Sequence, residues 1–182
     1  MGLMGVYNLY YFSSINSNAF FTVLLPAGPV MISRKGKYAI RSALYLARHY
    51  GSGPISVEKI SDDEGISRKF LETIMQELKN GGLLHSHRGK RGGYVLRQHP
   101  QKITIGRIIR LIDGPLAPVR CVSATAYAPC PDCPSEKNCN IRFMMKEVRE
   151  AISRVLDLKT LDQALRDADR DGNAAKELMF YI

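Results

Sequence analysis

The chain has 182 residues, of which 45% are hydrophobic, so it has enough apolar material for one domain, or for one small domain with an appendage. Its 26 Lys and Arg residues outnumber its 17 Asp and Glu residues, which gives a formal net charge of +9. This surplus favours a polyanionic partner, because Lys and Arg neutralise phosphates and release their counterions. The uncharged stretch 19–32 is short for a membrane span and contains two prolines, so we expect no membrane partner.

Residues 1–30 differ in composition from the rest of the chain. They contain no Asp, Glu, Lys or Arg, whereas all 43 such residues lie in 31–182. The segment is rich in Tyr, Phe, Asn and Ser and has no clear periodicity. The break favours a disordered tail, or a translation start placed too far upstream, over an extension that touches a membrane.

Three helices are predicted in the first patterned part of the chain. One begins at Ser33 and carries an apolar stripe, a second covers 57–64, and a third covers 67–79 with Ser67 as its cap. Gly65 provides a turn between the second and the third. Two short helices joined by a tight turn that contains glycine indicate a helix-turn-helix.

Residues 83–97 predict a β-hairpin. Residues 83–86 and 94–96 fit two strands, and 88–93 form a glycine-rich tip with three positive charges between them. A basic hairpin directly after a helix-turn-helix is a wing, so we expect a mainly α fold with a small β-hairpin wing, a winged helix-turn-helix. The tip could instead be a plain turn or an enzyme's phosphate loop, but it matches neither the Walker nor the dinucleotide-binding pattern.

After the wing, the sequence predicts a helix over 104–112, a cysteine-containing loop, and a long helix from about Ile141. The long helix has apolar residues at heptad-like spacing for four turns. One winged helix can cover little of this stripe, so we expect a homodimer rather than packing within the chain.

Residues 160–163 fit a capping box before a last short helix. The expected divisions are an extension at 1–30, a DNA-binding domain at 31–115, a cysteine-rich loop at 116–140, a dimerisation helix and C-terminal helix at 141–170, and a tail at 171–182.

Basic side chains are concentrated between residues 67 and 97, where seven Lys and Arg stand against two Glu. On the third predicted helix they mix with Glu, Thr and Gln. Arg can fork onto guanine, Gln can pair with adenine, and Glu can accept from cytosine or reject other bases. Basic residues at the wing suit phosphates or a narrow minor groove. The candidate DNA-contacting residues are Ser67, Arg68, Lys69, Glu72, Thr73 and Gln76 on the helix, and Arg88, Lys90 and Arg91 on the wing.

All four cysteines of the chain lie within nineteen residues, at Cys121, Cys130, Cys133 and Cys139. Thiolates gathered in one loop suit an iron–sulfur cluster or a zinc ion. The irregular spacing favours the cluster, since zinc sites more often use two close pairs, and a thiol–disulfide switch is a further alternative. Residues 1–20 have no Lys or Arg and so no n-region of a secretory signal. We therefore expect metal or redox chemistry in the cytoplasm rather than structural disulfides.

Residues 31–165 resemble the Rrf family of bacterial transcriptional regulators, of the IscR, NsrR and CymR type. The resemblance rests on KYAIRSAL at 37–44, GISRKFLE at 65–72, RGKRGGY at 88–94 and IGRII at 105–109. It implies a homodimer on a roughly palindromic double-stranded DNA operator, with each winged helix in a major groove.

The resemblance also implies a cofactor, because many members hold a two-iron or four-iron cluster with three loop cysteines. These match the first, third and fourth cysteines of this chain. Some members add a histidine at the position of Arg142, and others use an acidic residue at the position of Lys37. Neither residue here is a suitable ligand, so Cys130 is the candidate fourth ligand. Glu72 matches a position that helps members to distinguish operator types.

The sequence therefore predicts a DNA-binding transcriptional regulator, not an enzyme, that senses redox state, iron or nitric oxide through a cluster. Loss or oxidation of the cluster would reshape the loop and shift the two helices that contact the DNA bases. The main alternative is the same fold without a cluster, regulated by thiol oxidation, zinc or a partner metabolic enzyme. An electron carrier is a third possibility, but it would not need the basic wing.

Overall fold

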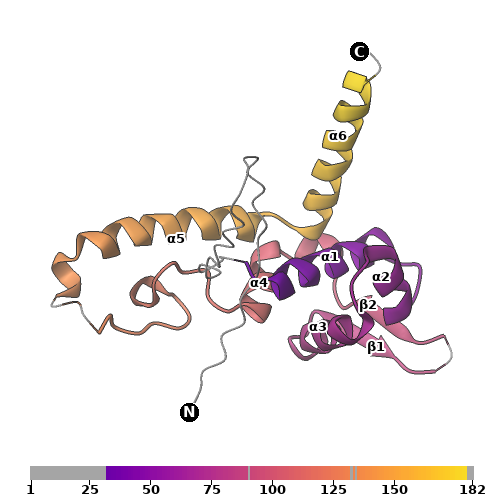
Figure 1. Cartoon of the computed structure of the whole chain (residues 1–182), viewed down its shortest axis with the longest axis horizontal. Helices are drawn as coiled ribbons and strands as arrows, with labels where there is room; N and C mark the ends of the chain where they lie inside the picture. Colours follow the sequence, from indigo (N-terminus) through magenta and orange to yellow (C-terminus); the bar gives the residue numbers. More distant parts are fainter. Residues whose placement is uncertain (1–31, 90, 132, 134, 180–182) are drawn as a thin grey trace, which may run out of the picture. The chain divides into compact units, whose positions relative to one another are not determined.

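The computed structural model describes residues 32–89, 91–131, 133 and 135–179, and the expectation for 1–30 lies outside them. The described chain is mainly helical and has a two-stranded antiparallel sheet, which confirms the predicted fold class (Figure 1). Its elements are α1 (Arg34–Arg48), α2 (Val57–Glu64), α3 (Arg68–Asn80), β1 (Leu84–His87), β2 (Gly93–Leu96), α4 (Ile105–Ile112), α5 (Asn140–Leu158) and α6 (Leu161–Met179), with short 3-10 helices η1 (Pro100–Lys102), η2 (Arg120–Val122) and η3 (Glu136–Asn138).

Serine side chains cap the first two helices, which begin close to the predicted positions. Ser33 Oγ accepts a hydrogen bond from the Gly36 backbone N–H, and Ser56 Oγ accepts one from Lys59 N–H. The expectation that the Ser67 side chain caps α3 is wrong. Ser67 occupies the N-cap position, but its side chain makes no capping bond, and α3 starts from the backbone bond of Leu71 N–H to the Ser67 carbonyl (2.9 Å).

The core lies among α1, α3 and α4. It includes the apolar face of α3, which is fully buried against residues of α1 and α4. Burying each large aliphatic side chain contributes about 1.5–3 kcal/mol, so this face fixes the rotation of α3 about its axis. The opposite face of α3 must then lie outward. The buried α3 residues are Leu71, Ile74, Met75 and Leu78.

The wing is anchored at its second strand. β1 and β2 pair from Leu84↔Leu96 to His87↔Gly93, close to the predicted strands. The backbone of Ile55 adds a bridge to β2, with Ile55 N donating to Tyr94 O (3.1 Å) and Tyr94 N to Ile55 O (2.8 Å). A Cβ atom on Gly93 would lie 2.3 Å from the Ile55 carbonyl oxygen, so this close approach requires glycine.

The junction between α5 and α6 is tied to the start of α4. Thr160 and Gln163 form the predicted capping box, with Gln163 N donating to Thr160 Oγ1 (3.1 Å) and Thr160 N to Gln163 Oε1 (3.0 Å). Leu161 N–H donates to the Ile103 carbonyl (2.9 Å). The helix that follows is longer than expected: it continues past Asp171 to Met179. Residues 174–179 are good helix formers, whereas Gly172 and Asn173 before them are poor ones.

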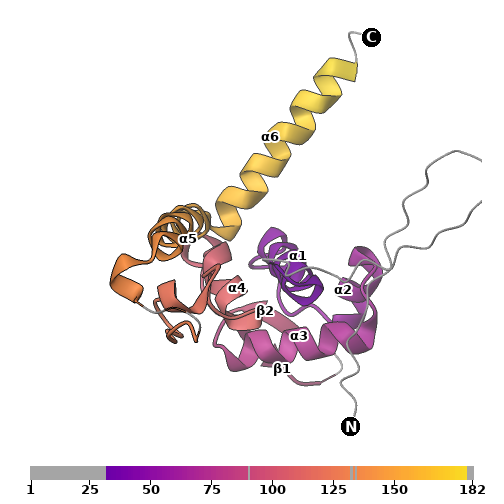
Figure 2. The same ribbon diagram turned by 60° about the vertical axis from the view of Figure 1, so that its left-hand side comes forward.

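The first turns of α6 pack against α1 and the core, and the rest of the helix extends away from them (Figure 2). Within the described residues, no helix combines the length and the apolar character that a membrane span requires.

Candidate DNA-reading face and cysteine loop

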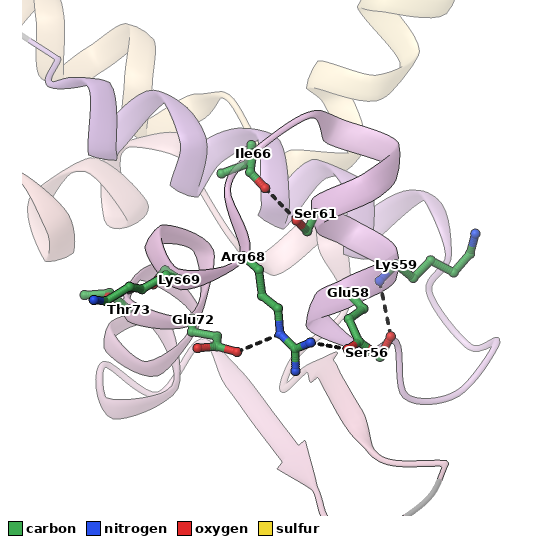
Figure 3. Close-up of polar contacts among 9 residues, drawn as sticks. All are labelled: Ser56, Glu58, Lys59, Ser61, Ile66, Arg68, Lys69, Glu72 and Thr73. Carbon is green, nitrogen blue, oxygen red and sulfur yellow. Dashed lines mark hydrogen bonds and ion pairs between the residues drawn. The ribbon is translucent and has the colours of Figure 1, made fainter.

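The outer face of α3 carries the residues predicted to contact DNA. All six, Ser67, Arg68, Lys69, Glu72, Thr73 and Gln76, are exposed, on the side away from the buried stripe. Figure 3 shows Lys69 and Thr73 projecting together from α3, away from Arg68. Contacts along the helix hold two of these side chains: Thr73 Oγ1 donates to the Lys69 carbonyl (3.3 Å), and Gln76 Nε2 donates to Asn80 Oδ1 (3.0 Å).

Arg68 lies between two carboxylates. Its Nε donates to Glu72 Oε1 at 3.0 Å, one turn along α3, and its Nη1 donates to Glu58 Oε1 on α2 (Figure 3). The hydrogen bond to Glu72, and then the charge of Glu58, raise the pKa of Arg68 above its ordinary value. Partial burial, and then the charge of Glu72, raise the pKa of Tyr94 on β2. Glu58 is not among the predicted DNA-contacting residues, because it lies on another helix.

The wing presents its arginines to solvent. Arg88 and Arg91 are exposed, and Lys90 lies outside the described residues. Gly92 N–H closes the turn on the Gly89 carbonyl (2.8 Å), and a Cβ on Gly92 would lie 2.4 Å from the His87 carbonyl oxygen. β1 packs against α3, so the wing and the outer face of α3 belong to one packed unit.

The cysteine loop brings two of its thiols close together. Cys133 and Cys139 lie near each other, and both are half-buried. Partial burial, and then the neighbouring Cys139 thiol, raise the pKa of Cys133, whereas the backbone N–H of Arg142, the largest contribution, lowers the pKa of Cys139. Cys139 stands at the N-cap of α5, where backbone N–H groups favour a thiolate.

The other two cysteines occupy different surroundings. Cys121 is buried in η2. Cys130 is exposed, and its carbonyl accepts a hydrogen bond from the Cys133 N–H (3.3 Å). In the described part of the chain, no group of three or more His, Cys, Asp or Glu side chains is assembled as a metal site. The four thiols suit an iron–sulfur cluster in chemical type, but Cys121 and Cys130 would have to move toward the Cys133–Cys139 pair.

Arg142, which stands where some similar regulators have a ligand, holds the loop together instead. Its Nε donates to the Cys121 carbonyl (3.4 Å) and lies 3.7 Å from Glu136 Oε2. Tyr127 OH donates to the other Glu136 oxygen (2.7 Å), and this bond raises the pKa of Tyr127. These contacts connect both ends of the loop to the first turn of α5. The sequence holds no local signal for them.

The apolar stripe of α5 is covered only in part. Ile152 and Leu156 pack against the core, so the chain itself covers some of it. Other large apolar side chains of α5 remain exposed, and such a patch is typical of an interface. They are Ile141, Phe143, Met144, Val148, Val155 and Leu158.

Comparison with known proteins connects these features to one family. The model of the Rrf2 family, described as an iron-dependent transcriptional regulator, matches residues 32–167. An rrf2-like HTH-type transcriptional regulator of Rhodobacter capsulatus is 38% identical over 82% of this chain and 99% of its own length. The structure of CymR, the global cysteine regulator of B. subtilis, is similar with a TM-score of 0.62 and 35% identity, over 75% of this chain and 96% of that one. The structure of T. potens IscR gives 0.59 and 31%, over 78% and 89%.

Proposed function

Because this chain belongs to the Rrf2 family of transcriptional regulators, we propose that it binds a double-stranded DNA operator as a homodimer, with an affinity that the cysteine loop controls. The family consists of DNA-binding regulators rather than enzymes, so no catalytic residue is assigned. One observation carries the proposal: the same chain has an exposed polar face on α3 and two neighbouring thiols, Cys133 and Cys139, in the loop that leads into α5. Since its ligand is DNA, we place the protein in the cytoplasm.

In this proposal, α3 enters a major groove, and the wing arginines contact the flanking backbone or the minor groove. Lys69 and Gln76 offer donors to base edges, and Glu72 and the Thr73 hydroxyl oxygen offer acceptors. The net charge of +9 supports this assignment, because DNA affinity grows with the number of phosphates neutralised.

The proposed sensor is an iron–sulfur cluster held by Cys121, Cys130, Cys133 and Cys139. Such a cluster supplies a centre that oxidants, nitric oxide or iron shortage can change. Two of these thiols, Cys133 and Cys139, lie near each other, and the lowered pKa of Cys139 favours the thiolate that metals require. The remaining two thiols lie on the same loop, which extends from α4 to α5.

The proximity of Cys133 and Cys139 also favours a second candidate, a thiol switch without a cluster. A peroxide-class oxidant would take two electrons from the pair, the S–H bonds would break, an S–S bond would form, and two protons would leave with the reduced oxidant. The similarity to a regulator described as the global cysteine regulator supports this alternative.

The proposed dimer uses the exposed apolar side chains of α5. Two copies of this helix, packed against each other, would bury the side chains that the chain leaves uncovered. A two-fold axis at α5 would also present two copies of α3 to two half-sites of a palindromic operator.

Selection from a random double-stranded DNA library tests this function without knowledge of the operator. We expect the purified full-length protein to enrich one roughly palindromic sequence and to bind it as a dimer. Selection of no sequence, or of a site for a single protomer, would contradict the proposal. Repeating the selection with oxidised and anaerobic protein tests the control by the loop.

A further inference from the structure

The arrangement around Arg68 contains more negative than positive charge. One guanidinium is shared between Glu58 and Glu72, so the three side chains together carry one net negative charge. Lys59, the neighbour of Glu58, does not compensate for it, because its ammonium pairs with Asp63 (3.1 Å). We call Glu58, Arg68 and Glu72 the Arg68 clamp. This net negative charge lies at the start of the helix proposed to enter a polyanion.

The position of Arg68 explains why it attracts two carboxylates. Arg68 is the first residue of α3, where the helix dipole disfavours a cation. Carboxylates on both sides offset this unfavourable placement. All three side chains are more than half exposed, so water screens the pairs and the clamp can open at little cost.

The two carboxylates hold different atoms of the guanidinium. Glu72 takes Nε, and Glu58 takes Nη1 from the side of α2 (Figure 3). A guanidinium forks onto guanine O6 and N7 with two of its N–H groups. Glu58 therefore competes with guanine for Arg68. Because one guanidinium cannot neutralise two carboxylates, the negative charge of Glu72 is only partly neutralised.

From this arrangement we propose that Glu58 is a specificity-determining residue, which acts through Arg68 and makes no base contact. With Glu58 in place, the start of α3 presents the Glu72 carboxylate, which accepts from the N4 amino group of cytosine and repels the acceptors of guanine. Without Glu58, Arg68 is free to fork onto guanine or to neutralise Glu72. The inference rests on the proposed function, because it requires α3 to read DNA.

The variant Glu58→Gln tests the inference in the full-length protein by selection from a random double-stranded DNA library. We expect the ratio of guanine to cytosine affinity at the base pair nearest the start of α3 to rise by about tenfold, the magnitude of one good base contact. Glu58→Asp keeps the charge but shortens the side chain by one methylene, so it should shift the same ratio with little change in overall affinity.

Asp62→Asn provides the matched control. Asp62 is an exposed carboxylate on the same helix and outside the Arg68 clamp, so its removal should raise overall affinity without changing base preference. In an Arg68→Met background, Glu58→Gln should have no further effect on the base ratio. Base preferences of Glu58→Gln equal to those of Asp62→Asn would overturn the inference and leave the proposed function intact. A wild-type protein that selects no sequence would overturn both.

Discussion

Arg110 and Asp157 form a bidentate ion pair between α4 and α5, with distances of 2.5 Å for Nη1–Oδ1 and 2.7 Å for Nη2–Oδ2. α4 belongs to the core of the winged helix, and α5 starts at the cysteine loop. Gly106 leaves room for the pair, since a Cβ there would lie 2.2 Å from Asp157 Oδ1. The pair therefore connects α5 to the core of the winged helix through charged groups.

Replacing Asp157 with Asn should weaken this connection. We expect a loss of stability of about 0.5–1 kcal/mol, because the pair is bidentate but partly exposed and therefore screened. Urea unfolding measures this loss as a lower midpoint with an unchanged slope. Glu147→Gln removes an exposed charge from the same helix, outside this pair, and should cost less. Equal losses in the two variants would show that the Arg110 contact has no special role.

The same pair predicts a pH dependence. The hydrogen bond from Arg110 lowers the pKa of Asp157. In the unfolded chain this carboxyl has an ordinary pKa of about 3.9, so the stabilisation is complete above that pH and is lost as pH falls toward the lowered pKa. The difference in unfolding free energy between wild type and Asp157→Asn should therefore shrink below about pH 4. A difference that stays constant in this range would contradict the assignment.

The two wing arginines should contribute to the salt dependence of DNA binding. Replacing Arg88 and Arg91 with Ala should weaken binding to all DNA sequences by similar factors, because these residues are assigned to the backbone or a narrow groove. The slope of log affinity against log salt should fall by about one for each arginine. Lys137→Ala, an exposed cation of η3, should leave the slope unchanged. An unchanged slope for the wing variant would remove the wing from the interface.

A substitution at Val148 tests whether α5 forms the dimer interface. It is 41% exposed on α5, and a Glu there would place a charge among the apolar side chains of the proposed interface. Sedimentation should show Val148→Glu as a folded monomer with strongly reduced operator affinity, whereas Lys146→Ala on the same helix should remain dimeric. A dimeric Val148→Glu protein would place the interface elsewhere.

Cysteine substitutions distinguish the two proposed sensors, the iron–sulfur cluster and the thiol switch. Replacing Cys133 or Cys139 with Ala should abolish the response to oxidants under either proposal. Cys130→Ala discriminates, because it should deplete bound iron if four thiols hold a cluster and should leave a Cys133–Cys139 switch intact. Iron and acid-labile sulfide content, measured beside operator affinity, distinguishes these outcomes.

Most of the helical fold could be predicted because its signals are local. The apolar stripe of α1, the bounds of α2, the turn at Gly65 and the capping box at Thr160 each depend on residues a few positions apart. The basic hairpin that follows a helix-turn-helix was equally visible in the order of the elements.

The unpredicted features depend on contacts between distant parts of the chain. Glu58 meets Arg68 only because α2 and α3 pack at a particular angle. Arg142 reaches the Cys121 carbonyl across 21 positions, and its sequence context suggested only a poor metal ligand. Ser67 satisfies the cap pattern, yet its side chain is left available on the reading face. Local rules indicated where these residues lie, but not their partners.

Control of DNA binding by the loop thiols can be measured most directly on one anaerobic preparation. Operator affinity is determined first on the preparation as isolated, together with its iron and sulfide content, and again after controlled oxidation. We predict bound iron and sulfide, and a large change in affinity that Cys139→Ala abolishes. A wild-type affinity that is the same before and after oxidation, whatever the metal content, would contradict control by the loop.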